Sequence, residues 1–182
     1  TQGNRDLRWE KASQYDIGAD LSFWSGALTV SADLFQKDTK DLLYNKPTSA
    51  VSGFTYKISN IGSIRNRGLE ITLGGDLSYS DFRWTGDFNI AFVKNRLTSL
   101  TDDDDILTTD DYHALKVGEE VGSFYLIKML GIYQSDEEVP ETLYKEGVRA
   151  GDIRYEDVNR DGRIDTVNDI QFVGSANPLF TG

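Results

Sequence analysis

The sequence of 182 residues contains no cysteine and only one histidine. The lack of cysteine excludes a disulfide framework, a thiol nucleophile and a thiolate zinc site. No apolar run approaches the roughly 18 residues that a membrane-spanning helix needs, and no segment resembles a signal peptide. Proteins that depend on disulfides, thiol chemistry, thiolate-bound zinc or membrane-spanning helices are therefore not expected.

Positive charge is also scarce, since 19 Lys and Arg residues stand against 30 Asp and Glu residues. The formal net charge is -11 and the pI is near 4.5. This balance argues against nucleic acid and against an anionic membrane surface as partners. The length is enough for one ordinary domain with a sizeable core. Because the chain starts at Thr1 without a methionine and stops at "NPLFTG", we expect both ends to lie inside a longer protein.

The segment from Gln14 to Phe23 alternates strictly between polar and apolar residues. Its apolar residues are Tyr15, Ile17, Ala19, Leu21 and Phe23. A period of two predicts a strand with one apolar face. After a short turn around Ser25-Gly26 the alternation resumes with Leu28, Val30, Ala32 and Leu34, which predicts a hairpin.

A second hairpin is predicted farther along the chain. Its apolar positions are Leu69, Ile71, Leu73 and Leu77, followed after a tight turn near Ser80-Asp81 by Phe82, Trp84, Phe88, Ile90 and Phe92. We expect strands over about 13–37 and 67–93. Long connections are expected over about 38–60 and 94–182.

Two architectures fit these alternating strands. A soluble β-sandwich turns its polar face to bulk water. A transmembrane barrel instead turns apolar residues outward and polar residues inward, with short turns at one rim, long loops at the other and a girdle of aromatic residues. Aromatic residues do gather near the short turns, at Phe23, Trp24, Tyr79, Phe82 and Trp84. Alternation favours the barrel but leaves both architectures open.

Three motifs carry a resemblance to one family. "NRDLRWEKASQYDIGADLSF" contributes Asn4, Asp6, Leu7, Trp9, Glu10, Gln14, Gly18 and Asp20. "NIGSIRNRGLEITL" contributes Asn60, Gly62, Asn66, Gly68 and Glu70. "GDIRYEDVNRDGRID" and "DIQFVGSANPLFTG" contribute Gly151, Asp152, Tyr155, Asp157, Asn159, Asp161, Gly162, Gly174, Pro178 and Phe180. In order and spacing the sequence resembles TonB-linked outer-membrane proteins of the SusC/RagA type, least so over about Leu97–Lys116.

The resemblance implies an all-β fold of antiparallel amphipathic hairpins belonging to a large transmembrane β-barrel. Barrels of this class have 22 strands and a plugged lumen, and they lie in the outer membrane of Gram-negative bacteria. Long extracellular loops are expected, with at most a short helix, which the composition places after Pro140. We expect the short turns to face the periplasm. The plug and the TonB box lie outside these residues.

The resemblance also implies partners. They are TonB, a SusD-like surface lipoprotein that lids the extracellular mouth, an oligosaccharide or peptide substrate, and outer-membrane lipid, but no nucleic acid. The leading hypothesis is therefore that the chain forms part of an active importer that catalyses no reaction. The alternative is a soluble, secreted, calcium-stabilised β-domain that acts as an adhesin-like binding module.

The segment "DVNRDGRID", residues 157–165, has the spacing of an EF-hand calcium loop, including Gly162 at the sixth position. The candidate ligands are Asp157, Asn159, Asp161, Arg163 (through its backbone carbonyl), Asp165, Asn168 and Asp169. Asn168 occupies position 12, and the carboxylate that would close the site, Asp169, comes one residue late. We therefore expect calcium to bind weakly and to act structurally. The alternative is a solvated turn whose Asp and Asn side chains bond their own backbone.

Other candidate sites carry weaker signals. The acidic run 101–111 fits a solvated loop better than a metal cluster. His113 lacks a neighbouring Ser/Asp pair or cysteine with which to form a triad. No spacing singles out a pair of carboxylates for glycoside hydrolysis. No enzymatic activity is expected.

Overall fold

The structure is a computed structural model that describes residues 3–48, 51, 53–101 and 106–182. The chain forms two compact units. The first, here called the sheet unit, comprises Thr1–Leu107, Lys116–Val121 and Asn177–Gly182. The second, the loop unit, comprises Thr108–Leu115 and Gly122–Ala176. The two units are described separately below.

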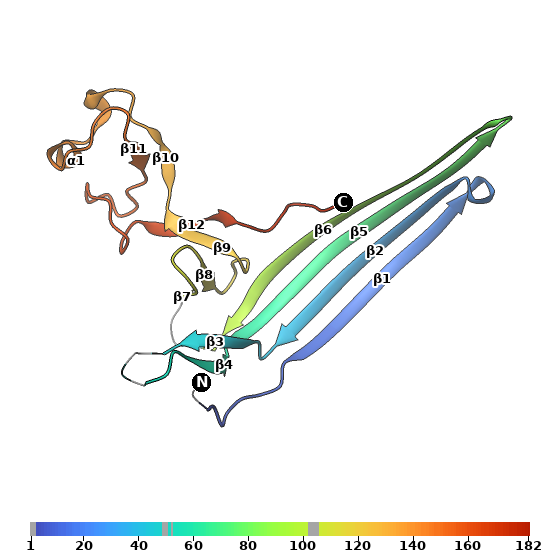
Figure 1. Ribbon diagram of the computed structural model, residues 1–182, viewed down its shortest axis with the longest axis horizontal. Helices are drawn as coiled ribbons and strands as arrows, with labels where there is room; N and C mark the ends of the chain where they lie inside the picture. Colours follow the sequence, from blue (N-terminus) through green and yellow to red (C-terminus); the bar gives the residue numbers. More distant parts are fainter. Residues whose placement is uncertain (1–2, 49–50, 52, 102–105) are drawn as a thin grey trace. The chain divides into compact units, whose positions relative to one another are not determined.

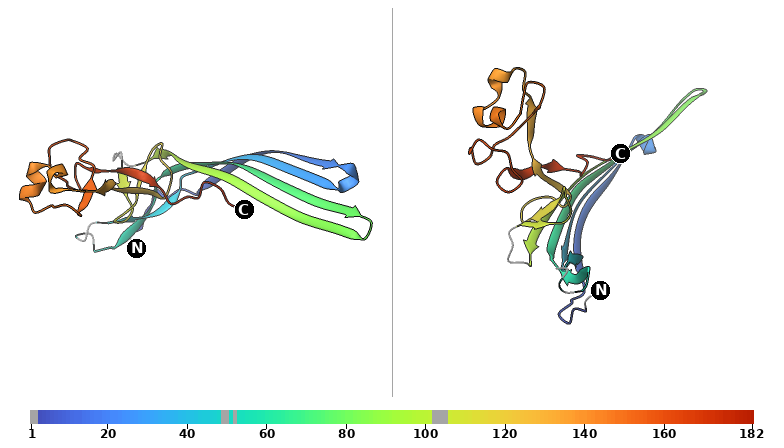
Figure 2. Two further views of the ribbon diagram at one scale, coloured as in Figure 1. Left: turned by 90° about the horizontal axis from the view of Figure 1, so that it is seen from above. Right: turned by 60° about the vertical axis from the view of Figure 1, so that its left-hand side comes forward.

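The sheet unit is built on one antiparallel four-stranded sheet with the strand order β1-β2-β5-β6. The strands are β1 (Lys11–Phe23), β2 (Leu28–Lys40), β5 (Gly62–Tyr79) and β6 (Phe82–Leu100). The long strands lie side by side in every view and follow one curve (Figure 1, Figure 2). The all-β antiparallel fold predicted from alternation is therefore confirmed.

The register of this sheet places the predicted apolar residues in continuous rows. Ile17 pairs with Leu34, Leu34 with Leu69, and Leu69 with Phe92. Because side chains at paired positions lie on the same face of a sheet, every second row across β1, β2, β5 and β6 is apolar. One face is therefore apolar and the opposite face is polar.

Short turns close both hairpins. A 3-10 turn, η1 (Trp24–Gly26), joins β1 to β2, and Ser25 has φ 56° within it. Between β5 and β6 only Ser80 and Asp81 remain outside the strands. Ser80 has φ 53°, the left-handed conformation that tight hairpin turns of this length require.

The second hairpin is longer than the expected 67–93, since β5 begins at Gly62 and β6 ends at Leu100. At the added positions of the apolar face, Arg65, Lys94 and Arg96 replace apolar residues, so a search for apolar alternation stops too early. The expected connection 38–60 contains a small hairpin of β3 (Leu43–Pro47) and β4 (Tyr56–Asn60).

The last residues of the chain also depart from expectation. Sequence alternation places them in a loop, but Thr181 forms an antiparallel bridge with Ala91 of β6. The N–H of Ala91 donates to the Thr181 oxygen at 2.7 Å, and the Thr181 N–H donates back at 2.9 Å. The rings of Phe180 and Phe92 lie 6.3 Å apart. The segment therefore continues the sheet beyond β6.

The loop unit is made of short elements. β9 (Ser123–Ile127) pairs with β12 (Ile170–Ser175), and β10 (Met129–Ile132) pairs with β11 (Ile153–Tyr155). A 3-10 turn, η3 (Asp136–Glu138), precedes the helix α1 (Glu141–Lys145).

The single short helix expected after Pro140 is α1. Within the described part of the chain no helix is long and apolar enough to cross a membrane. A further small hairpin pairs β7 (Ile106–Thr108) with β8 (Ala114–Lys116).

Among the residues that the structure describes, the one sizeable core expected from the length is not found. In the loop unit, Tyr133, Val139 and Leu143 form a small buried cluster, with Val148 and Ile164 packed against it. The apolar residues of β1, β2, β5 and β6 are mostly exposed, and Leu97, which is 1% exposed, is an exception near one end of the sheet. Most of the apolar surface of the sheet unit therefore lacks a protein partner in this chain.

Candidate functional site

The first candidate site is the apolar face of the sheet, here called the outer face. Its exposed members are Tyr15, Ile17, Leu21, Phe23, Leu34, Leu73, Leu77, Tyr79, Phe82, Trp84, Phe88 and Phe92. Exposed apolar patches of more than a few hundred Å² are rare in soluble monomers and mark contact with another apolar phase or partner. Such a face is suited to lipid or to a large protein interface.

Aromatic residues occupy the end of the outer face that carries the turns. The Phe23 and Trp24 rings are 6.0 Å apart. Trp84 lies over the glycine pair formed by Gly75 and Gly86, because a Cβ atom built on either would come within 2.6 or 2.8 Å of its ring. The two glycines thus let the indole lie flat against the strands. This arrangement fits the girdle where aromatic rings meet a membrane interface.

The opposite face, here called the lumen face, is polar and acidic. Its carboxylates are Asp16, Asp20, Asp33, Glu70, Asp76 and Asp87, all of them on exposed residues. Asp33 lies directly opposite Glu70. Like charges at opposed positions destabilise a sheet unless water or a partner screens them. The lumen face therefore suits contact with water or with a partner that donates hydrogen bonds.

Small residues let larger side chains of the lumen face lie close to the sheet. The Ser31 hydroxyl donates to the Asp20 carboxylate at 2.5 Å. A Cβ atom on Gly18 would lie 2.0 Å from an Asp33 oxygen. A Cβ atom on Gly68 would lie 2.3 Å from the Phe35 ring. Gly18 and Gly68 belong to the motifs of the sequence, so the structure gives these motif positions a steric role.

The motif asparagines hold the N-terminal segment against the start of the second hairpin. The Asn60 side-chain amide donates to the carbonyls of Arg8 and Asp41 at 2.9 and 2.6 Å. Its oxygen accepts the Arg8 N–H at 2.8 Å. Asn4 donates to the Ile58 carbonyl at 2.9 Å. These residues are structural, and the sequence alone did not reveal that role.

The second candidate site is the loop 157–169 in the loop unit. The Asp157 carboxylate accepts the N–H groups of Asp161 at 3.2 Å and of Gly162 at 2.7 Å. Asn159 accepts the Asp161 N–H at 3.1 Å, and Asp161 accepts the Arg163 N–H at 2.8 Å. Gly162 has φ 80°, the conformation expected of the glycine at the sixth position of a calcium loop.

Asp169, not Asn168, is the residue that closes the loop. Its side chain is fully buried, with 0% exposure. One carboxylate oxygen accepts the Val158 N–H and the other accepts the Asp165 N–H, both at 2.8 Å. Val167, between Asp165 and Asp169, is 82% exposed.

Asp165 and Asn168 sit together at the end of the loop. The Asp165 carboxylate accepts the N–H groups of Asn168 and Val167 at 2.8 Å. The backbone N–H of Asn168, followed by that of Val167, holds the pKa of the Asp165 carboxyl below its ordinary value.

In the described conformation the carboxylates of the loop bond to the loop's own backbone. Among the residues that the structure describes, no group of three or more His, Cys, Asp or Glu side chains is placed to hold a metal ion. The carboxylates of Asp157 and Asp169 are engaged with backbone N–H groups of the loop itself. The geometry matches the solvated-turn alternative, and calcium binding stays a prediction.

His113 has a partner that the sequence did not reveal. Its Nδ1 lies 2.9 Å from an Asp110 oxygen, and the N–H groups of Tyr112 and His113 donate to the same carboxylate. These contacts, the Tyr112 N–H foremost, lower the pKa of Asp110. The Thr109 hydroxyl donates to the His113 carbonyl instead of its ring, so this His-Asp pair has no neighbouring nucleophile among its described contacts. Asp102–Asp105 of the acidic run lie outside the described residues.

Comparisons with known proteins agree with this two-faced sheet. The family model described as "TonB dependent receptor-like, beta-barrel" matches residues 1–172. TonB-dependent receptor P39 of Formosa agariphila is 33% identical to this chain, over 99% of the chain and 20% of the receptor. TonB-dependent receptor SusC of Bacteroides thetaiotaomicron is 29% identical over 90% of the chain and 16% of its own length. The chain thus spans a fifth or less of these relatives, which are named as receptors and not as enzymes.

Solved structures show the same fold. The RagAB peptide transporter superposes with a TM-score of 0.77 at 22% identity, covering 99% of this chain and 20% of the matched one. The RagAB peptide importer in its closed-closed state gives a TM-score of 0.76. The register, the exposed outer face and these matches lead to one assignment: the chain belongs to the β-barrel family of TonB-dependent receptors.

Proposed function

We propose that this chain forms part of the wall and outer loops of an outer-membrane barrel that imports oligosaccharides or peptides with energy derived from TonB. The observation that carries the proposal is the exposed apolar face on strands whose other face is acidic. In a barrel, such strands place the apolar face in lipid and the polar face in the lumen. An open sheet edge is not tolerated in lipid, so the strands would function only within the closed barrel.

The height of the apolar band supports a membrane environment. On β5 the band extends from Leu69 to Tyr79. At a rise of about 3.3 Å per residue this segment measures roughly 33 Å along the strand. A strand tilted by about 40° would then span roughly 25 Å along the barrel axis, the height of the apolar band in outer-membrane barrels.

The proposed orientation places the turns at η1 and at Ser80-Asp81 in the periplasm. The hairpin of β3 and β4 and the loop unit then lie outside the cell. Cysteines introduced at Val51, which is 96% exposed, and at Asp81 of the full-length protein test this arrangement. An impermeant thiol reagent applied to intact cells should label Val51→Cys and spare Asp81→Cys. Equal labelling of the two would rule the orientation out.

The loop unit offers a surface for a SusD-like lipoprotein. On the small sheet of β10 and β11, Met129 lies opposite Tyr155 and Ile132 lies opposite Ile153, and all of them are exposed. A contiguous exposed apolar surface of this kind is typical of protein interaction sites. We propose that it contacts the lid partner.

This contact can be tested by co-purification. Ile132→Asp with Ile153→Asp should reduce recovery of the lipoprotein with the full-length transporter, because charges at the centre of an apolar interface oppose burial. The matched control is Val167→Asp, an exposed apolar residue away from these two strands. Unchanged recovery with the double variant would refute the proposed contact.

Substrate class is the least constrained part of the proposal. The RagAB structures are named as a peptide transporter and peptide importer. Oligosaccharides and peptides therefore both stay candidates for this chain. Uptake by cells that express the full-length protein with its neighbouring lipoprotein, screened with glycan and peptide libraries, distinguishes them. Import of neither class would refute the transport proposal.

The alternative function is a soluble secreted β-domain that binds calcium and acts as an adhesin. The left-handed turn at Gly162 and the loop closed by Asp169 are the features that favour it. Fractionation of cells separates the two proposals. Recovery of the full-length protein in the outer membrane supports the transporter, whereas release into the medium as a soluble protein supports the alternative.

A further inference from the structure

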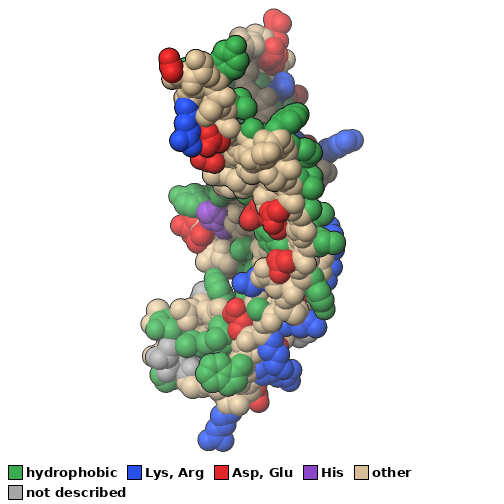
Figure 3. Space-filling view, turned by 90° about the vertical axis from the view of Figure 1, so that its right-hand side faces the viewer, with side chains coloured by type: hydrophobic (Ala, Val, Ile, Leu, Met, Phe, Trp, Pro, Cys, Tyr) green, Lys and Arg blue, Asp and Glu red, His purple; other side chains and the backbone are tan. Residues whose placement is uncertain are grey.

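The charged residues of the four long strands are sorted between the two faces. By alternation, the basic residues Lys11, Lys40, Arg65, Arg67, Lys94 and Arg96 lie on the outer face, accompanied by the single acid Asp38. The other acids of these strands lie on the lumen face, with Lys37 and Arg83. Lys and Arg side chains gather along one side of the view in Figure 3, next to hydrophobic side chains. The outer face is thus locally basic in a chain of net charge -11.

These cations oppose one another directly across the strands. Arg67 pairs with Lys94, and Arg65 pairs with Arg96, on β5 and β6. Lys11 pairs with Lys40 on β1 and β2. Like charges at directly opposed positions destabilise a sheet. Repeated cation pairs on one face are therefore expected only where an anion lies between or over them.

The protein itself neutralises little of this charge. Arg65 forms an ion pair with Asp38 at 2.6 Å, and Arg67 donates to the neutral Gln36 at 2.9 Å. Lys94 and Arg96 have no carboxylate partner among the described residues. The four cations of β5 and β6 line one hollow together with Asn95, Thr98 and Glu120. The carboxylate of Glu120 is engaged by the Asn177 amide at 3.2 Å.

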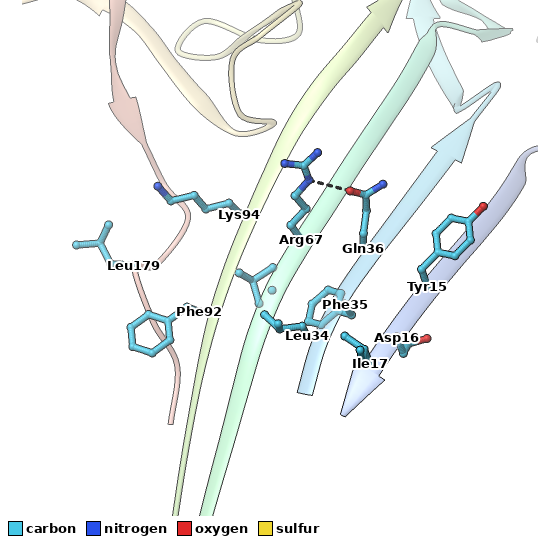
Figure 4. A pocket seen from close by; sticks show the side chains of 12 residues that line it. Tyr15, Asp16, Ile17, Leu34, Phe35, Gln36, Arg67, Phe92, Lys94 and Leu179 are labelled. Carbon is cyan, nitrogen blue, oxygen red and sulfur yellow. Dashed lines mark hydrogen bonds between the residues drawn. The ribbon is translucent and has the colours of Figure 1, made fainter. Parts of the chain in front are cut away.

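The hollow lies directly beyond the apolar band. Leu69 and Phe92 form the last apolar row on β5 and β6, and Arg67 and Lys94 form the next row on the same face. Figure 4 shows Arg67 bonded to Gln36, with Lys94 on the neighbouring strand and Leu34 and Phe92 on the apolar side. Two residues of a strand measure roughly 6.6 Å. The side chains of this face therefore change from apolar to cationic over that distance. In the orientation proposed above, the headgroups of the outer leaflet would lie at that level.

We propose that this hollow binds the phosphate groups of the phosphorylated glycolipid in the outer leaflet, the lipid A part of lipopolysaccharide. Guanidinium groups match phosphate in a bidentate way, and a lysine adds a point charge. An apolar face continuous with the hollow would contact the acyl chains of the same lipid. The proposal rests on the orientation given under the proposed function, which places this end of the strands outside.

The proposal differs from the expectation that composition gives. The overall acidity argued against an anionic membrane surface, but the acidic residues of these strands lie on the lumen face. Fields of surface charges are largely screened beyond about 8 Å at physiological salt, so the local cations determine what the outer face binds.

The test uses the full-length protein purified in a non-ionic detergent and titrated with lipid A. Arg67→Gln with Lys94→Gln should weaken binding roughly 25-fold, since each cation near an anionic lipid surface contributes about fivefold. The matched control is Lys37→Gln with Arg83→Gln, which removes equal charge from the lumen face and should change binding less than about twofold. Phosphatidylglycerol and inorganic phosphate serve as the other ligands, and both should bind more weakly than lipid A.

Several outcomes would overturn the inference. Equal loss in both double variants would show a general charge effect, and unchanged binding in the Arg67/Lys94 variant would show that the hollow is not the site. If phosphatidylglycerol binds as tightly as lipid A, the glycolipid is excluded as the specific ligand. The same holds if inorganic phosphate binds and lipid A does not. Uptake is measured separately. Lipid A binding by a protein that imports nothing would leave this inference standing while refuting the transport proposal.

Discussion

The sheet unit and the loop unit place their apolar residues in opposite ways. In the sheet unit Ile17, Leu34 and Phe92 are exposed on an outer face. In the loop unit Tyr133, Val139 and Leu143 are buried in a small cluster. One chain therefore contains two regions suited to different surroundings, lipid for the first and water for the second. The amino-acid composition is an average over both units, so it does not indicate that one unit exposes its apolar residues and the other buries them.

The two units also use acidic residues differently. On the lumen face the carboxylates are exposed. Two of them, Asp33 on β2 and Glu70 on β5, lie at directly opposed positions of neighbouring strands. In the loop 157–169 the carboxylates accept backbone N–H groups and hold the chain in turns. Acid content thus serves solvation in one region and local structure in the other.

The largest effect that we expect tests the two faces of the sheet. Ile71→Lys or Ile90→Lys, which alter a paired position on the outer face, should reduce the free energy of folding into membranes by about 2–4 kcal/mol, because a cation at mid-bilayer depth is costly. Thr72→Lys and Asn89→Lys, the adjacent pair on the lumen face, should cost little. Folding into lipid vesicles at graded urea concentrations measures both. Similar losses for both pairs would contradict the assignment of faces.

The corresponding test for the loop unit removes part of its core. Leu143→Ala should destabilise the loop unit by about 2 kcal/mol, the low end for a buried leucine because the cluster is small. Hydrogen exchange of residues 133–148 in the full-length protein should rise accordingly, while exchange in β5 and β6 stays unchanged. Leu179→Ala, at an exposed position, is the control. A loss of protection in β5 would show that the two units are not independent.

A smaller effect is expected at the motif asparagine of the sheet unit. Asn60→Ala removes the bonds to Arg8 and Asp41 and should cost about 1–2 kcal/mol. Because these bonds hold the N-terminal segment, proteolysis before β1 should become faster. Asn66→Ala, at another motif asparagine on β5, serves as the comparison. If the two variants are cleaved at equal rates, the bonds of Asn60 have no special role.

The loop 157–169 should respond to acid. The pKa of Asp165 is lowered in the folded loop, so its contribution to stability is present above the unfolded value, about 3.9. That contribution is lost as pH falls through the lower folded pKa. Amide exchange at Val167 and Asn168, corrected for the intrinsic rate, should therefore rise below about pH 4. Asp165→Asn should abolish this dependence, and a dependence that persists in this variant would assign it to another group.

The smallest expected effect concerns calcium. If the loop binds the ion, calorimetry should show a dissociation constant of about 10⁻⁴–10⁻³ M, as in weak extracellular sites. Asp161→Ala should abolish the heat, and Asp136→Ala, outside the loop, should not. Calcium binding would then stabilise the conformation of the loop in addition to the loop's own hydrogen bonds. Absence of heat at millimolar calcium would leave the loop as a turn held by Asp157 and Asp169.

Local order was largely predictable from the sequence. The strand periodicity around Ile71 and Ile90, the short turns and the helix after Pro140 all depend on neighbouring residues, so they can be predicted from a short segment. The motifs also identified the family. The ends of β5 and β6 were less predictable, because beyond Leu69 and Phe92 the outer face changes from apolar residues to Arg67 and Lys94.

Tertiary structure decided the features that depend on residues distant in the sequence. Pairing of β2 with β5 brought Asp38 beside Arg65 and Gln36 beside Arg67, and no hairpin turn along the chain predicts that pairing. The same holds for Thr181, which pairs with Ala91 although 90 residues separate them in the sequence, and for Asp169, whose carboxylate accepts the Val158 N–H. The sequence by itself determined which residues alternate and turn. Strand register and loop closure decided which charged side chains lie next to one another. The reason is that the pairing of a strand depends on all strands of the sheet and not on its own residues alone.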